Sequence, residues 1–161
     1  MLSAYSRLKE ILQATPAKLF VISDEVASNK PNPKKWSRKE ILGHLIDSAS
    51  NNHQRFVRLQ IDNEIELPKY KQDEWVSVQR WQQKNWEEII ALWKLYNQHI
   101  LHIFQHIDES KLFNTVTLGD EEDEIYTLQF LIDDYVDHME NHLKQILRRN
   151  KSSINYPSPG S

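Results

Sequence analysis

The chain contains only three glycines among its 161 residues. Strand-rich folds need glycine in their turns, whereas helices exclude it because glycine loses the most conformational freedom on folding. Apolar residues also recur at the helical spacing of three to four residues. Only residues 114–118 alternate in the manner of a strand, and that stretch is short. The sequence therefore predicts an all-α fold.

Four segments show this helical periodicity, at about residues 3–22, 37–59, 85–107 and 127–149. The second begins with a capping box, in which Ser37 caps the helix and Glu40 reaches back to the serine. Asn85 begins the third in a similar way. The connection 61–84 lacks clean periodicity and is longer than a hairpin needs. We therefore expect a four-helix bundle in which this connection crosses from one end to the other.

Size and composition limit the classes of function. One domain is expected over residues 1–150, with a flexible C-terminal tail at 151–161. A net charge of −3 offers no basic stripe for a phosphate backbone, and the absence of cysteine fits a reducing compartment. Apolar runs such as 19–22 are far short of a membrane span, and we expect no signal peptide. We expect a cytoplasmic protein without nucleic-acid or membrane partners.

Two histidines stand on the apolar face of the last predicted helix. With Tyr135 as the reference, His142 lies about 20° away and His138 about 60° away, inside the stripe that should face the core. Imidazoles four residues apart on a helix lie one above the other and can reach one ion. A single buried histidine is usually an ordinary core residue, but this pair indicates a metal site. Glu140 falls on the opposite face, so the pattern is not that of a zinc protease.

The third ligand has to come from another helix. On the second helix, His44 stands about 110° and His53 about 70° from the middle of the apolar stripe. Spacing alone leaves both open and leans to His53. The remaining histidines, His99, His102 and His106, fall some 80° to 140° off the stripe of the third helix. They are expected at the surface, at an interface or as adventitious nickel binders.

Three segments of the chain resemble the DinB/YfiT-like superfamily. They are WSRKEILGHLIDS at 36–48 with NHQRF at 52–56, YKQDEW at 70–75, and DYVDHMENH at 134–142. The resemblance extends over about residues 8–147. It implies a four-helix bundle in up-down-down-up order and a divalent metal held by His44, His138 and His142. It therefore replaces the preference for His53.

The resemblance also implies an activity, that of a metal-dependent hydrolase or of a transferase that uses a low-molecular-weight thiol. The substrate is expected to be a small molecule and the metal zinc or nickel, and a homodimer is left open. Three neutral imidazoles leave a coordination position open, which is typical of a catalytic site where water or a thiol is activated. The alternative is a non-enzymatic helical module that binds a metal or a ligand.

Other side chains are assigned around this site. The carboxylates of Asp47 and Asp134 are candidates to orient the imidazoles, although each is equally an ordinary helix acid. Arg55 is either a group that holds an anionic substrate or a surface arginine. Trp36 and Trp75 are candidates for the walls of a cleft, with packing as the alternative.

Overall fold

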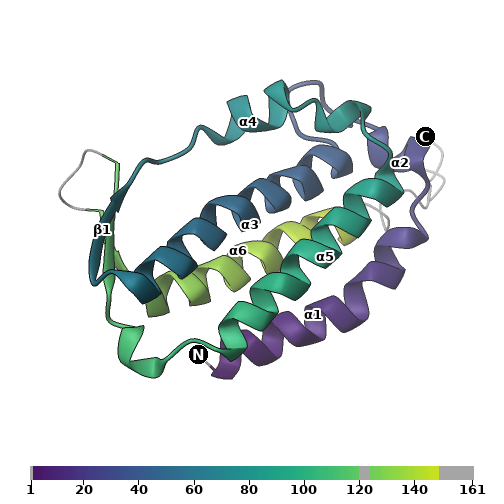
Figure 1. The fold of residues 1–161 in the computed structure, drawn as a ribbon. Coiled ribbons are helices and arrows are strands. Elements are labelled where there is room, and N and C mark those ends of the chain that lie inside the picture. The colour runs from purple at the N-terminus through teal and green to yellow at the C-terminus, as the bar shows by residue number, and fades with distance from the viewer. Residues whose placement is uncertain (1, 120–123, 149–161) are drawn as a thin grey trace, which may run out of the picture.

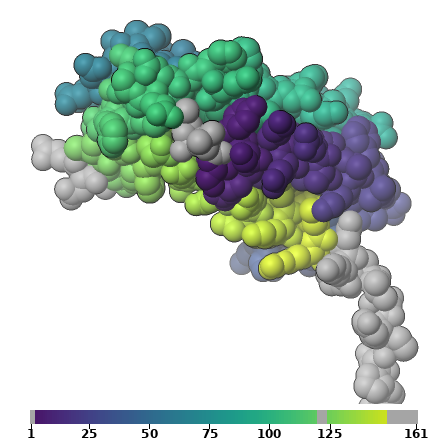
Figure 2. Space-filling view, turned by 90° about the horizontal axis from the view of Figure 1, so that it is seen from below, coloured from purple at the N-terminus to yellow at the C-terminus, as the bar shows by residue number. Residues whose placement is uncertain are grey.

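Four long helices lie side by side in the computed structural model, which describes residues 2–119 and 124–148 (Figure 1). They are α1 (Leu2–Phe20), α3 (Arg38–Ile61), α5 (Trp86–Gln105) and α6 (Leu128–Arg148). The predicted helices are confirmed to within two residues at either end. The tail predicted at 151–161 lies outside the described residues. On the face seen in Figure 2, α1 packs between α5 and α6.

The ends of these helices are tied together by hydrogen bonds. The Trp86 indole at the start of α5 donates to the carbonyl of Leu19 near the end of α1, at 3.0 Å. The Arg38 guanidinium at the start of α3 donates to the carbonyl of Ile146 near the end of α6, at 3.2 Å. The starts of α3 and α5 therefore lie at the same end of the molecule as the ends of α1 and α6.

The chain between α3 and α5, residues 62–85, runs back along the length of the helices (Figure 1). It carries β1 (Glu64–Leu67), α4 (Gln72–Val78) and the 3₁₀ turn η1 (Trp81–Gln83). We call this segment the crossover. Two further short elements are α2 (Asp24–Ser28), between α1 and α3, and η2 (Glu109–Lys111), after α5. Among the described residues, no helix is both long and apolar enough to span a membrane.

The prediction of an all-α fold is wrong in one respect, because the structure contains a small three-stranded sheet. Strand β2 (Thr115–Leu118) pairs in parallel with β1 and antiparallel with β3 (Ile125–Thr127). Burial alternates along both β1 and β2, and β2 falls within the stretch 114–118 that alternates in sequence. β3 has only three residues. The partner of β1 lies far along the chain, with Glu64 opposite Thr115, so local pattern could not reveal that pairing.

Candidate metal centre

Three imidazoles converge between α3 and α6. They belong to His44 on α3 and to His138 and His142 on α6, and one ring nitrogen from each lies within 4.8 Å of the other two. The Nε2 atoms of His44 and His138 are 3.1 Å apart. His44 is fully buried, whereas His138 and His142 are half-buried. The cluster therefore has a closed side at α3 and an accessible side at α6.

Burial keeps two of these imidazoles neutral. It lowers the pKa of His44 to about 3, with His138 and His142 adding to the effect, and the pKa of His138 to about 4, with His142 adding to it. A neutral imidazole has one N–H and one nitrogen lone pair. The Nδ1 atom of His142 lies 3.0 Å from the Oε1 atom of Gln145, so a proton on Nδ1 leaves the lone pair on Nε2. His44 and His138 thus offer lone pairs rather than positive charge.

The geometry fits a divalent metal ion. Two imidazole nitrogens bound to one tetrahedral zinc at about 2.0–2.1 Å lie roughly 3.3 Å apart, close to the 3.1 Å between His44 and His138. Without an ion, one of these nitrogens has to donate a proton to the other. The Nδ1 atom of His44 is buried without a hydrogen-bond partner among the described residues. On one side the cluster is covered by Trp36, whose ring centroid lies 4.8 Å from that of His44.

The sequence around His44 holds the crossover against α3. A Cβ atom on Gly43 would lie 2.3 Å from Cγ of Trp81, so only glycine leaves room for this indole. The same indole donates to the carboxylate of Asp47 at 3.3 Å, and the Gln79 amide donates to it at 2.7 Å. These hydrogen bonds oppose the rise in the pKa of Asp47 that burial causes. The hydrogen bonds of Asp47 therefore tie the crossover to α3 and do not orient an imidazole.

Asp134 and Glu140 on α6 likewise make no hydrogen bond with the three imidazoles in the described part of the chain. Asp134 is exposed; burial, and then Asp137, raise its pKa. Glu140 forms an ion pair with Arg7 of α1 at 2.9 Å. Neither carboxylate joins the three-histidine cluster.

The structure places His53 away from the cluster. Its Nδ1 atom lies 2.9 Å from the Tyr96 hydroxyl, and its ring centroid lies 5.3 Å from that of His99. The rings of His102 and His106 lie 4.4 Å apart at the exposed C-terminal end of α5, where His106 is the capping residue. The helical wheel favoured His53 over His44 because it assumes one buried stripe. In fact α3 is buried on all sides from residue 41 to 49, where the crossover covers the face opposite the bundle.

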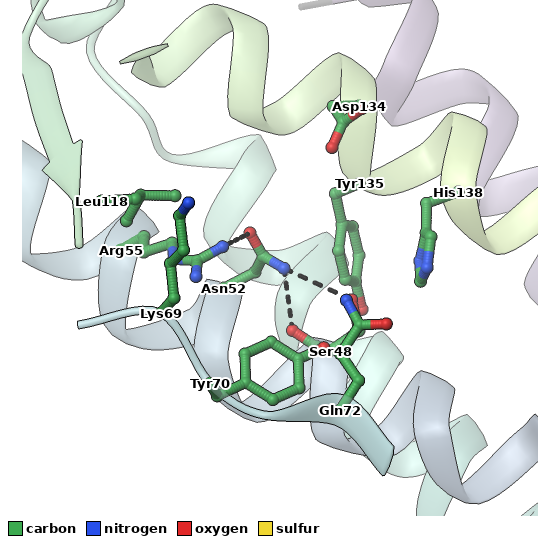
Figure 3. Close-up of a pocket in the computed structure, with 10 residues that line it drawn as sticks. All are labelled: Ser48, Asn52, Arg55, Lys69, Tyr70, Gln72, Leu118, Asp134, Tyr135 and His138. Carbon is green, nitrogen blue, oxygen red and sulfur yellow. Dashed lines mark hydrogen bonds between the residues drawn. The ribbon is translucent and has the colours of Figure 1, made fainter. Parts of the chain in front are cut away.

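A cavity of about 240 Å³ opens beside His138. Figure 3 shows it between α3 and α6, with the crossover on a third side. Its walls comprise Ser48, Asn52 and Arg55 of α3, Asp134, Tyr135 and His138 of α6, Lys69, Tyr70 and Gln72 of the crossover, and Leu118 of β2. Sequence reasoning missed most of these residues, although Ser48, Asn52 and Arg55 follow His44 at helical spacing on one face of α3.

A family model described as the DinB superfamily matches residues 6–146. This chain belongs to the DinB superfamily. The match covers most of the chain and most or all of each of the four long helices, so it confirms the resemblance seen in the sequence. A search of curated proteins found no match.

Two solved structures share the fold of this DinB-superfamily chain. YfiT from Bacillus subtilis is 19% identical with a TM-score of 0.77, and the alignment covers 92% of this chain and 87% of YfiT. YfiT is described as a probable metal-dependent hydrolase with an unusual four-helix bundle topology. YjoA from Bacillus subtilis, described as a DinB-like protein, is 16% identical with a TM-score of 0.62, and the alignment covers 98% of this chain and 96% of YjoA.

Proposed function

We propose that this chain is a metal-dependent enzyme in which His44, His138 and His142 hold one divalent metal ion, and that it acts on a small molecule as a hydrolase or a thiol transferase. The observation that carries this proposal is the 3.1 Å approach of the Nε2 atoms of His44 and His138 beside a third imidazole. The cavity next to His138 gives a small molecule access to that point.

The donor set supports a catalytic rather than a structural ion. Structural zinc is normally closed by four protein ligands, and only three converge among the described residues. When bound, such a metal lowers the pKa of water or of a thiol and so makes either a nucleophile near neutral pH. Imidazole ligands suit zinc and nickel alike, and both are part of the proposal.

The residues around the histidines have distinct roles in this proposal. Burial keeps His44 and His138 unprotonated, so that their lone pairs remain available above mildly acidic pH. Trp36 excludes water from one side of His44, and the crossover closes the cavity on another. Asp134 makes no hydrogen bond with the three imidazoles among the described residues, which favours a reaction that relies on the ion itself.

The fold is part of the proposal as well. The up-down-down-up order expected from the family resemblance is supported by the hydrogen bonds of Trp86 to Leu19 and of Arg38 to Ile146. In that order, the crossover has to pass along α3, where it can cover a site between α3 and α6. A low-molecular-weight thiol, a second copy of the chain and a cytoplasmic location remain predictions.

Cobalt substitution tests whether the site is open. Full-length untagged protein is stripped by a chelator, dialysed and loaded with Co²⁺, and small thiols and small anions are added while the visible spectrum is recorded from mildly acidic to alkaline pH. We expect a saturable spectral change with thiol or with rising pH, lost in His142→Ala and kept in His53→Ala. A cobalt spectrum that no thiol, anion or pH change perturbs would favour the non-enzymatic module instead.

A further inference from the structure

Arg55 is a half-buried cation that lacks an ionic partner. It lies on α3 in the wall of the cavity beside His138 (Figure 3). Its one hydrogen bond in the described part of the chain goes from Nη1 to the Oδ1 atom of Asn52, at 3.3 Å. No ion pair joins it to a carboxylate among residues 2–119 and 124–148. Since a guanidinium has five N–H donors, most of its hydrogen-bonding capacity is unused.

The neighbouring charges do not compensate Arg55. Lys69, the other cation in the cavity wall, is paired with Glu124 at 2.7 Å. Burial lowers the pKa of the Arg55 guanidinium, and Asp134 opposes this only through longer-range attraction. A charge withdrawn from water without a partner costs free energy unless a ligand supplies the opposite charge.

The polar groups next to Arg55 are arranged to hold it in place. Asn52 turns its amide nitrogen to Ser48, donating to the backbone carbonyl at 2.9 Å and to the hydroxyl at 3.3 Å. The amide oxygen of Asn52 therefore faces Arg55 and accepts a hydrogen bond from its guanidinium. The guanidinium is therefore oriented from its own helix, while its remaining N–H groups are left for something that enters the cavity.

The cavity connects Arg55 with the three histidines. His44, Ser48, Asn52 and Arg55 follow one another along one face of α3, and the eleven steps from His44 to Arg55 correspond to roughly 16.5 Å of helix axis. His138, which meets His44, lines the same cavity as Arg55. A small molecule that extends along α3 can thus have one end at the guanidinium and its reacting centre at the imidazoles.

We propose that Arg55 is the anion-binding end of the substrate cavity and that the substrate is a small molecule carrying a carboxylate. The guanidinium fork matches a carboxylate through two parallel hydrogen bonds. Asp134 lines the same cavity and would repel a phosphate dianion more strongly than a single negative charge. A volume of about 240 Å³ limits the ligand to a small molecule. The assignment of this ligand as a substrate rests on the proposed function, because only an enzyme has a substrate.

Nuclear magnetic resonance of the full-length protein tests this assignment. Butyrate is the probe, its neutral amide, butyramide, is the control for shape, and inorganic phosphate is the comparison anion. Each is titrated into zinc-loaded protein and into protein stripped of metal and freed of chelator by dialysis. The readouts are the side-chain Nε–H resonance of Arg55 and the backbone amides of Ser48, Asn52 and Tyr70. The variant is Arg55→Gln, and the matched control is Arg58→Gln, an exposed arginine one turn further along α3.

We expect butyrate to shift these resonances saturably in both metal states, with Arg55→Gln weakening binding at least roughly tenfold and Arg58→Gln leaving it unchanged. The inference would be overturned if butyramide caused the same shifts as butyrate, or if phosphate bound more tightly than butyrate. It would also be overturned if the response to butyrate survived in Arg55→Gln. Binding that needs zinc but not Arg55 would place the anion on the ion, which contradicts this inference and leaves the proposed function intact. Conversely, butyrate binding that depends on Arg55, together with a cobalt spectrum that nothing perturbs, would refute the proposed enzymatic function. The anion-binding site at Arg55 would then still stand.

Discussion

The Cα atom of Gly43 faces the indole of Trp81 so closely that an added Cβ atom would lie 2.3 Å from Cγ of the tryptophan. One turn further along α3, Asp47 accepts a hydrogen bond from the same indole. Residues on both sides of His44 therefore fasten the crossover onto α3. Because the crossover also lines the cavity through Tyr70 and Gln72, a change at Gly43 acts on the site without touching an imidazole.

We predict that Gly43→Ala destabilises the protein by about 1–3 kcal/mol, the usual cost of overpacking, despite the gain in helix propensity. Trp81 has to leave its position, and the crossover shifts with it. Urea unfolding followed by circular dichroism measures the loss. The control is Gly43→Ala in a Trp81→Ala background, where the same substitution should cost nothing; an equal cost in both backgrounds would show that the indole is not what Gly43 accommodates.

The helices were predictable from sequence, but the way in which the crossover covers the three histidines and the cavity was not. Periodicity marks α6 clearly because one face of that helix packs inward, and it correctly put His138 and His142 on that face. The same reasoning failed for His44, since α3 has no solvent-exposed face around this residue. The resemblance to the DinB family supplied His44 instead. Contacts such as Gly43 with Trp81 join segments far apart in sequence, and no local pattern contains them.

We predict that one divalent ion binds per chain and that His44→Ala and His142→Ala each weaken zinc binding by at least about 100-fold, because outer-sphere changes alone already cost 10–100-fold. His53→Ala should keep full occupancy, since its ring meets Tyr96 and His99 instead of the cluster. Elemental analysis of untagged protein and competition with a chromophoric chelator measure both quantities. Full occupancy in His44→Ala, or loss in His53→Ala, would mean that the ligand set is different.

Removal of the metal should leave the bundle folded. The buried core draws aromatic and aliphatic side chains from all four long helices, among them Leu8, Phe56, Trp93 and Ile132, and does not depend on the imidazoles. Small zinc domains unfold without their ion because they lack such a core. We expect the far-ultraviolet circular dichroism spectrum to be unchanged on chelation, while the midpoint of thermal unfolding falls because the stabilisation from ion binding is lost. Loss of the helical signal would show a structural ion.

The metal-free protein should become less stable as the pH falls. His44 and His138 keep a pKa of about 3 and about 4 in the folded chain, whereas an unfolded histidine takes up a proton near pH 6.5. Between these values the unfolded state binds more protons, so the free energy of unfolding decreases as the pH is lowered. From pH 7 to pH 5 we expect a loss of about 2 kcal/mol for each histidine that stays neutral.

Denaturant unfolding at several pH values, in the presence of a chelator, measures this loss. His44→Gln removes one of the two groups and should flatten the pH dependence, whatever it does to stability at neutral pH. A slope that is the same in wild type and in His44→Gln would contradict the burial of a neutral imidazole at this position.

Arg38 and Arg55 on α3 should differ in what they contribute to the stability of the fold. Arg38 is 4% exposed and donates to the carbonyls of Ile146 and Val26, so Arg38→Met leaves buried acceptors unsatisfied and should cost about 2 kcal/mol. Arg55 has one hydrogen bond to Asn52 and no ion pair within the described residues. A cation whose role is to bind a ligand contributes little to the stability of the fold. Replacing it by methionine, which has a similar length, removes the free-energy cost of withdrawing the charge from water. We therefore expect Arg55→Met to leave the free energy of unfolding within about 0.5 kcal/mol of wild type or to raise it. Urea titrations of both variants make the comparison, and a loss at Arg55 as large as that at Arg38 would show that this guanidinium holds the fold together.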